Sequence, residues 1–253
     1  MLFAYKVVIC VIVANACFCG FLYNHYGGSS ILSSSPKVQL LKNERVAQFG
    51  ENSITVKGVL PRVEHIKKGT FIEMGANDGL NSNSHYLEQN YGWRGLCIEA
   101  GPANHRQLTL NRPNCRNINA VVSDGIENQK FREFTGGLYG HSGFVDGRTD
   151  AEWSGLIRAH PTEKYHDWDV KTNTMSGILK ENDITNVDYF SLDVEGYEMK
   201  ILNSYPFEIH PVTVWTIESN KLDRKALLDF MEKRNYECKH YDKVNTICEL
   251  NEA

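Results

Sequence analysis

The sequence predicts an α/β domain in which a mostly parallel β-sheet carries helices on both faces. Three observations support this class. Short apolar segments typical of buried strands alternate with segments typical of helices, which requires crossover connections between parallel strands. A glycine-containing turn follows the first strand at residues 73–79. Acidic residues stand at the ends of the parallel strands, where open α/β sheets bind their ligands.

The sequence of the first half of the domain predicts strands and helices in alternation. Asn81 or Ser82 could cap the first helix, because short polar side chains accept hydrogen bonds from unpaired helical N–H groups. The second helix has to end before Pro113, because proline disfavours helical backbone in the preceding residue. In order, the expected elements are strand 69–75, helix 81–91, strand 95–100, helix 104–111, strand 116–124 and short strand 130–134.

The second half begins with residues 136–171, which are rich in Gly, His and Trp and show no clear period, so we expect a long irregular segment. The last helix has apolar residues at positions 222, 226, 227, 230 and 231, the spacing of an amphipathic helix. The expected elements are helix 175–182, strand 187–193, helix 197–204, strand 212–218, helix 222–234 and a hairpin over 235–250. A further helix is expected near 37–47.

Length and charge limit what the chain can be. With 253 residues there is room for one sizeable α/β domain, expected over residues 37–253. The composition, 42% hydrophobic and 23% charged, is that of a globular protein. The net charge of −4 provides no basic excess to neutralise phosphates, so we expect no nucleic-acid partner.

Residues 1–23 are expected to direct the chain into the secretory pathway. The stretch 7–23 is apolar except for Asn15 and is preceded by Lys6. As a helix it measures about 25 Å, and adding residues 2–5 lets it span a bilayer as a signal anchor. The alternative is a cleaved signal peptide, because 14–16 (Ala-Asn-Ala) fits a small-x-small cleavage site. Residues 24–36 predict a flexible stem. The protein is then a single-pass membrane protein facing the ER or Golgi lumen, or is secreted.

Four cysteines fall within the expected domain, and in an oxidising compartment an even number permits two disulfides. Cys238 and Cys248 lie in two strand-like segments of the final hairpin, which makes a cross-strand bridge plausible. Whether Cys97 and Cys115 form the second bridge is an open question, because Cys97 is expected to be buried within the second strand. The spacings do not resemble a zinc site.

The turn after the first strand, FIEMGANDG, predicts a nucleoside site. Gly75 permits a sharp bend at positive φ, and Gly79 lets a ligand or a helix approach the main chain. Asn77 replaces the middle glycine of a dinucleotide fingerprint, and Asp78 puts a negative charge where a pyrophosphate would sit. This disfavours a nicotinamide dinucleotide and suits S-adenosylmethionine, whose amino or sulfonium group Asp78 or Glu73 could face.

Four motifs in order carry a family resemblance: GANDG, WRGLCIEAGP (93–102), VDYFSLDVEGYEMKIL (187–202) and WTIESN (215–220). Together they resemble the FkbM family of S-adenosylmethionine-dependent methyltransferases, over residues from about 69 to 250. The resemblance implies the Rossmann-like class I methyltransferase fold, with a seven-stranded sheet whose last strand enters antiparallel. It also implies O-methylation of sugar or polyketide hydroxyls.

The expected donor site lies at the carboxyl ends of the strands. Glu99, at the end of the second strand, is expected to bind the ribose hydroxyls, and Asp124 with Ser123 the adenine amine. The cofactor-binding residues are then Glu73, Gly75, Asn77, Asp78, Gly79, Glu99, Ser123 and Asp124.

Methyl transfer to a hydroxyl requires a base. The expected catalytic residues are Asp193, with Glu195, at the end of the strand 187–193, and His141 in the irregular segment. Alternatively, His141 is a surface-loop residue, and Glu195 holds the first amides of the following helix. Asp193 and Glu218, with Glu195 and Asn220, could hold Mg²⁺, but a metal-free site is favoured.

The sequence thus predicts an O-methyltransferase that acts on a hydroxyl of a glycan or small secreted molecule and is tied to the membrane through its N-terminal segment. The alternative is a non-catalytic membrane protein with the same fold, serving in secretory or endosomal trafficking. The intact donor motif favours the enzyme.

Overall fold

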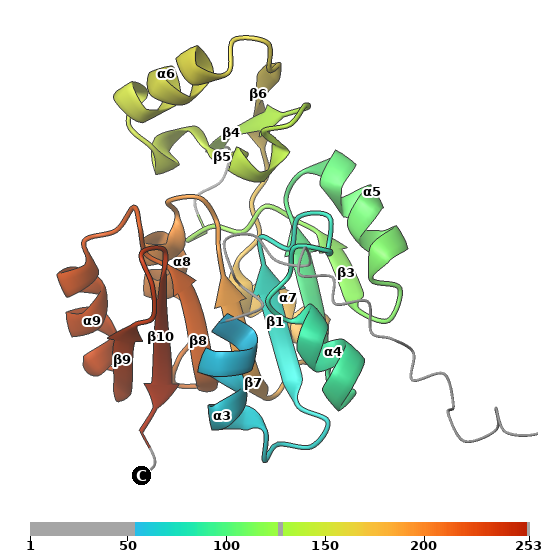
Figure 1. Cartoon of the computed structure of the whole chain (residues 1–253), viewed down its shortest axis with the longest axis vertical. Helices are drawn as coiled ribbons and strands as arrows, with labels where there is room; N and C mark the ends of the chain where they lie inside the picture. Colours follow the sequence, from blue (N-terminus) through green and yellow to red (C-terminus); the bar gives the residue numbers. More distant parts are fainter. Residues whose placement is uncertain (1–53, 126–128, 252–253) are drawn as a thin grey trace, which may run out of the picture. The chain divides into compact units, whose positions relative to one another are not determined.

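A seven-stranded β-sheet forms the centre of the computed structural model, which describes residues 54–125 and 129–251 (Figure 1). Its strands are β1 (Thr70–Met74), β2 (Arg94–Glu99), β3 (Arg116–Asn119), β7 (Val187–Leu192), β8 (Val212–Glu218), β9 (Tyr236–His240) and β10 (Asn245–Leu250). They run in the order β3-β2-β1-β7-β8-β10-β9; β10 is antiparallel to β8 and to β9, and the other neighbouring pairs are parallel. The predicted class I methyltransferase fold is confirmed.

Helices cover both faces of this sheet because its strands alternate apolar side chains between the two faces. On one face Phe71 and Tyr189 pack with apolar residues of α3, α4 and α5, and Figure 1 shows α3 and α4 in front of the sheet. On the other face Ile72, Phe190 and Trp215 pack with residues of α7, α8 and α9. The bounds are π-helical η2 (Ile54–Val59), α3 (Leu60–Val63), α4 (His85–Tyr91), α5 (Pro102–Asn111), α7 (Met175–Glu181), α8 (Glu198–Ser204) and α9 (Arg224–Glu232).

Two predicted elements are shorter than expected. The helix predicted to start at residue 81 starts at His85, because Ser82 and Ser84 donate hydrogen bonds to the buried carboxylate of Glu73 instead of continuing a helix. Ser82 still accepts from the N–H of His85, as a capping residue would. The strand predicted to reach residue 124 ends at residue 119, and the chain then turns to form a single parallel bridge at residues 122 and 173.

A second, three-stranded sheet corrects the expectation that residues 136–171 are irregular. Within this stretch lie η3 (Tyr139–His141), β5 (Gly143–Phe144), η4 (Val145–Gly147), α6 (Asp150–Ala159) and β6 (Tyr165–Val170). Strand β4 (Gln129–Phe134) pairs antiparallel with both β5 and β6. The missed signal was Thr149-x-x-Glu152, whose side chains form a reciprocal capping box at the start of α6. Figure 1 places this small sheet and α6 beyond one end of the large sheet.

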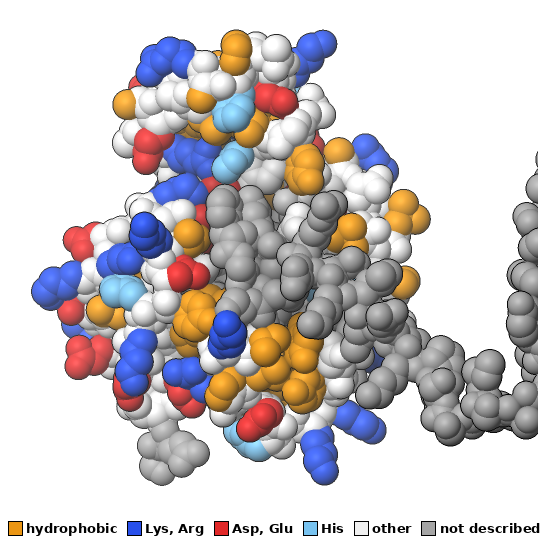
Figure 2. Space-filling model, viewed as in Figure 1, with side chains coloured by type: hydrophobic (Ala, Val, Ile, Leu, Met, Phe, Trp, Pro, Cys, Tyr) orange, Lys and Arg blue, Asp and Glu red, His pale blue; other side chains and the backbone are white. Residues whose placement is uncertain are grey.

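Within the described residues, no helix combines the length and the apolar character needed to cross a membrane. The predicted anchor or signal peptide (1–23), the stem (24–36) and the helix near 37–47 lie outside the described residues. On the visible face, acidic and basic side chains of the described residues are interspersed (Figure 2). The expectation from net charge that there is no nucleic-acid partner stays a prediction.

Both disulfides are present. Cys238 and Cys248 occupy directly opposed positions of β9 and β10, so the hairpin predicted to carry a bridge does so. Cys97, which is fully buried in β2, bonds to Cys115 just before β3. Burial within the strand therefore did not prevent the second bridge, because the residues leading into β3 lie beside β2.

We expect Cys238→Ser to lower the free energy of unfolding by about 2–3 kcal/mol, the chain-entropy value for closing a loop of this length. Denaturant titration of the oxidised protein measures this. Lys239→Ser, an exposed neighbour on the same strand, serves as the control and should be nearly neutral. Finding Cys238 and Cys248 as free thiols in the unreduced, denatured protein would contradict the bridge.

Candidate functional site

A cavity lies at the carboxyl ends of β1, β2 and β7, with about 900 Å³ of empty space that is partly open to solvent. Strand β1 stands between β2 and β7, where the strand order reverses. Open α/β sheets bind ligands at such a switch point, because the connections leave in opposite directions and open a crevice. The cavity is lined by these strand ends, by residues 120–122, by Phe131 and by most of the segment 139–144.

The turn after β1 depends on two glycines. Gly75 has a φ of +84°, and a Cβ placed there would lie 1.7 Å from the carbonyl oxygen of Asp193. Gly79 has a φ of +81°, and its Cβ would lie 2.6 Å from Cγ of Arg112 and 2.7 Å from Cδ1 of Leu108. Only glycine avoids both the strain and the collisions. The close neighbours of Gly79 are thus the side chains of α5 and its C-cap rather than the cavity.

Glu99 ends β2 and faces the cavity with its side chain almost fully buried. Its Oε2 accepts from the N–H of Asn77 at 2.8 Å, and its Oε1 accepts from the N–H of Gly101 at 2.7 Å. Burial nevertheless raises the pKa of Glu99 to about 7, and the nearby carboxyl of Glu133 adds to this shift. A buried carboxylate with remaining acceptor capacity suits a diol that brings hydroxyl donors.

The carboxylates of Glu73 and Asp78 are occupied by the chain itself. Glu73 accepts from Ser82 Oγ at 2.6 Å and from the N–H of Asn83 at 2.9 Å, and it also pairs with Arg112. Asp78 does not line the cavity, and its Oδ1 accepts from the N–H of Leu80 at 3.0 Å. Glu73 lines the cavity, and contact of Glu73 or Asp78 with the amino or sulfonium group of the donor stays a prediction.

Two amide oxygens of the cavity wall lack partners. Oδ1 of Asn77 and Oδ1 of Asn83 are buried, accept no hydrogen bond from the residues that the structure describes, and belong to side chains that line the cavity. Buried acceptors without donors are unfavourable, so both oxygens fit a ligand that brings N–H groups. With the carboxylate of Glu99 and the apolar wall that Val122 and Phe131 contribute, they match the ammonium, ribose and purine parts of S-adenosylmethionine.

Ser123 and Asp124 lie beside the cavity but do not line it. Ser123 Oγ donates to Asp124 Oδ1 at 2.8 Å and accepts from Gln129 Nε2 at 2.9 Å. The residues just before them, Val121 and Val122, form the cavity wall instead. Contact of Ser123 or Asp124 with adenine stays a prediction.

Asp193 and Glu195 both line the cavity at the end of β7, in different surroundings. Glu195 has a φ of +60°, and its carboxylate pairs with Arg148 and Lys221. Burial opposes ionisation of Glu195, but the hydrogen bond from His141 and the charges of Lys221 and Arg148 outweigh it and lower the pKa to about 2. Glu195 is therefore a poor proton acceptor at neutral pH.

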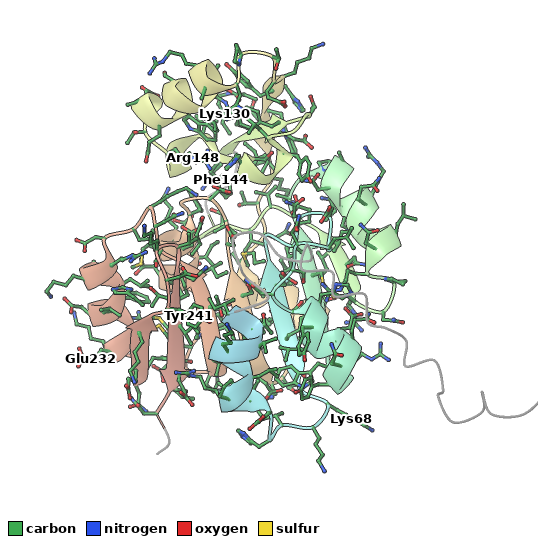
Figure 3. All side chains as sticks on the ribbon, in the orientation of Figure 1. Lys68, Lys130, Phe144, Arg148, Glu232 and Tyr241 are labelled. Atoms are coloured by element: carbon green, nitrogen blue, oxygen red, sulfur yellow. A yellow bond between two sulfur atoms is a disulfide. The ribbon has the colours of Figure 1, made fainter. Side chains whose placement is uncertain are left out.

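His141 lies against Glu195, although the two are far apart in sequence. Its Nδ1 is 3.5 Å from Oε1 of Glu195, and its side chain is 36% exposed. Helix η3 holds it between cavity-lining residues 140 and 142. Figure 3 shows Phe144 and Arg148 on the side of the small sheet that faces the large sheet. The structure thus brings two of the three expected catalytic residues together; Glu195 lines the cavity, and His141 does not.

The carboxyl oxygens of Asp193, Glu198 and Glu218 lie within 4.8 Å of one another. The magnesium alternative named Glu195 as a ligand beside Asp193 and Glu218, but the carboxyl group that lies close to both is that of Glu198. Its Oε1 accepts from the N–H groups of Val194 and Gly196, and burial raises its pKa to about 7. Glu218 accepts from Asn220 Nδ2 and pairs with Lys221. The chain itself therefore supplies hydrogen-bond donors or a cation to two of the three carboxyl groups.

Sequence reasoning did not identify Asn83, Phe131, Arg148 and Lys221 as site residues. Lys221 follows the WTIESN motif directly, so its place at a strand end could have been noticed. Phe131 lies in β4 of the three-stranded sheet, and Arg148 follows η4. No local sequence pattern predicts that these residues lie near the ends of the large sheet's strands.

The family model for the methyltransferase FkbM domain matches residues 73–238. A search of curated protein sequences found no match. Among solved structures, the chain is similar to a precorrin-6y C5,15-methyltransferase from Geobacter metallireducens, with 12% identity, a TM-score of 0.44 and coverage of 79% of this chain and 86% of that one. It is also similar to a putative caffeoyl-CoA O-methyltransferase from Staphylococcus aureus, with 13% identity, a TM-score of 0.42 and coverage of 94% and 100%.

A third similar structure is M. capricolum TrmK in complex with S-adenosylhomocysteine, with 13% identity, a TM-score of 0.41 and coverage of 81% of this chain and 67% of that one. These three likenesses concern the fold, which the strand order already defines. The family match covers more than half of the chain and spans the donor turn, β2 and the end of β7. The chain belongs to the FkbM methyltransferase domain family.

Proposed function

We propose that this protein is an S-adenosylmethionine-dependent O-methyltransferase that acts on a hydroxyl of a glycan or small secreted molecule. The observation that carries the proposal is the match between the cavity wall and the donor. Glu99 suits the ribose diol, the apolar wall around Phe131 suits the purine, and the free oxygens of Asn77 and Asn83 suit an ammonium group. Membership of the FkbM family supports methyl transfer as the reaction.

When bound, S-adenosylmethionine supplies a methyl group on a positively charged sulfur. The chain has to hold the acceptor hydroxyl in line and remove its proton. His141 is the first candidate base, because Glu195 faces its Nδ1 and leaves Nε2 for the acceptor. The low pKa of Glu195 keeps that carboxylate ionised, so it would stabilise the imidazolium that forms when His141 takes the proton. Asp193, which also lines the cavity, is the second candidate.

The proposed compartment is the lumen of the ER or Golgi, with the chain as a single-pass membrane protein, or the exterior if the N-terminus is cleaved. Its support is the pair of disulfides within one domain, because such bridges persist in oxidising compartments. The apolar stretch over 7–23 in the sequence agrees with this. A luminal enzyme meets glycans and other secreted hydroxyl compounds, which is why these are the proposed acceptors.

The test is transfer of labelled methyl from S-adenosylmethionine to a panel of glycans and small hydroxyl compounds, with the full chain in mild detergent. We expect methylation of at least one acceptor. We expect His141→Gln to lower kcat by about 10²–10⁴-fold, the usual contribution of a general base, and to leave donor affinity unchanged.

His166→Gln is the matched control, because His166 also faces a glutamate at 3.3 Å, but that glutamate, Glu133, does not line the cavity, whereas Glu195, the partner of His141, does. Its kcat should stay within about twofold of the wild-type value. A folded chain that neither binds the donor nor transfers a methyl group would contradict the proposal and favour the non-catalytic trafficking protein. Full activity in His141→Gln would shift the base to Asp193.

A further inference from the structure

Resting on the proposed function, a further inference concerns which acceptors the cavity admits. We propose that the acceptor is a hydroxyl compound without an anionic group near the reacting hydroxyl, such as an unsubstituted sugar. The charge of the cavity excludes acceptors that carry a carboxylate, a sulfate or a phosphate at that place.

The wall of the cavity carries carboxyl groups and no basic side chain. Among the described residues, the cavity lining contains no Lys, Arg or His. It does contain four acids: Glu73, Glu99, Asp193 and Glu195. An anionic acceptor has to leave water for a partly enclosed space whose walls carry the same charge. It therefore meets both a desolvation cost and repulsion.

Glu73 and Glu99 belong to the part of the cavity that we assign to the donor. Arg112 pairs with Glu73 and also with Glu88, so this group adds no positive excess. S-adenosylmethionine brings one net positive charge, which the ionised carboxylate of Glu99 offsets. The acceptor has to lie beside the candidate bases at the end of β7, so the charge at that end decides which acceptors enter.

The end of β7 collects carboxyl groups from three elements. The carboxyl oxygens of Asp193, Glu198 and Glu218 lie within 4.8 Å of one another, and Glu195 follows Asp193 by two residues. Burial and the charge of Glu218 raise the pKa of Glu198 to about 7. A cluster that already suppresses one of its own charges resists the approach of another anion.

The cations that pair with these carboxyl groups are used within the chain. Arg148 and Lys221 both pair with Oε2 of Glu195. Nζ of Lys221 also lies 3.1 Å from Oε2 of Glu218. Neither cation lines the cavity, so an anionic acceptor would have to displace a carboxylate of the chain to reach one of them.

The balance at this end stays negative in the state that accepts a proton. His141 is then neutral, because a general base has to be unprotonated. With Glu198 protonated as well, the carboxylates of Asp193, Glu195 and Glu218 face two cations. A neutral acceptor is insensitive to this excess, whereas a carboxylate, sulfate or phosphate is repelled by it.

Pairs of acceptors that differ in charge but hardly in shape test the inference. The probes are hexuronic acids against their primary amides, and aminohexoses N-acylated with succinate against the same sugars acylated with its monoamide. Within each pair every hydroxyl is kept. With the full chain in mild detergent and labelled S-adenosylmethionine, kcat/KM for the amide should exceed that for the acid by at least about tenfold, and added salt should narrow the difference.

Glu218→Gln removes one charge of the cluster without touching the acceptor, because Glu218 does not line the cavity. The ratio of kcat/KM between acid and amide should rise by about three- to tenfold, and a ratio cancels any general loss of activity. Glu249→Gln is the matched control with the same change in net charge. Glu249 also pairs with a cation, Arg62, at 2.8 Å and does not line the cavity, so its ratio should equal that of the wild type.

An acid that is methylated as well as its amide would overturn the charge rule, as would label that appears only in acidic compounds. A ratio that responds neither to salt nor to Glu218→Gln would assign the discrimination to shape and overturn it as well. A folded wild type that labels no compound of the panel contradicts the proposed function itself. The charge rule and the function therefore fail in distinguishable ways.

Discussion

Glu99→Gln is expected to weaken binding of S-adenosylmethionine by at least about 100-fold at pH 8. The buried carboxylate ends β2 and faces the cavity, and two ribose hydroxyls would donate to it. Hydrogen bonds to a charged group contribute about 1.5–3 kcal/mol each, against about 0.5–1.5 kcal/mol for neutral ones. Glutamine keeps one neutral acceptor and presents an NH₂ group to the second hydroxyl, so the loss is about 2.5–4.5 kcal/mol, which corresponds to about 100-fold or more. Calorimetry of the full chain measures the dissociation constant.

The same residue predicts a pH dependence. Burial raises the pKa of Glu99 to about 7 in the free protein. Hydroxyl donors stabilise the ionised form, so the donor binds the deprotonated protein more tightly. Affinity is therefore highest above pH 7 and falls as the pH drops through 7, by about tenfold per unit well below the pKa.

Glu99→Gln should remove this dependence. Glu198→Gln is the matched control, because Glu198 is also buried with a pKa raised to about 7 but does not line the cavity, and its variant should keep the dependence. Circular dichroism establishes that each variant is folded. A folded Glu99→Gln protein that binds the donor like the wild type would show that the ribose site is misplaced.

Arg112→Met is expected to cost about 3–5 kcal/mol of folding free energy, the largest stability effect we predict. Arg112 is 1% exposed, and its side chain pairs with Glu88 and Glu73. It also donates to Ser82 Oγ at 2.7 Å and to Ser84 Oγ at 3.1 Å. Methionine fills a similar volume but leaves two buried carboxylates without their cation, and uncompensated buried charge is strongly unfavourable.

Urea denaturation of Arg112→Met against the wild type measures the loss. Arg94→Met is the control, because Arg94 is exposed and its Nη1 makes one long contact, 3.4 Å, to the carbonyl of Asn114. That variant should change stability by no more than about 0.5 kcal/mol. If Arg112→Met were as stable as the wild type, the buried charges would have to be neutralised by another group.

Much of the large sheet could be predicted from sequence because its signals are local. Strands such as 187–193 are continuous apolar segments, and the helix after residue 222 shows its period within three turns. The small sheet was missed because β5 has two residues and β6 is largely exposed, so neither has an apolar period. Their pairing with β4 depends on contacts between distant residues, such as Phe131 opposite Trp168.

The sequence by itself determined the fold class, the family, the conformation at Gly75 and the place of Glu99 at the end of a strand. Each follows from a few neighbouring residues, whose backbone preferences and apolar spacing act over short distances. Only the tertiary structure decided which polar groups are satisfied. Arg112 lies 39 residues from Glu73, and Arg148 lies 47 from Glu195, yet these pairings occupy the two carboxylates. Among the described residues, the side-chain oxygens of Asn77 and Asn83 have no hydrogen-bond donor, because partners are assigned by packing distant segments together, which no local pattern specifies.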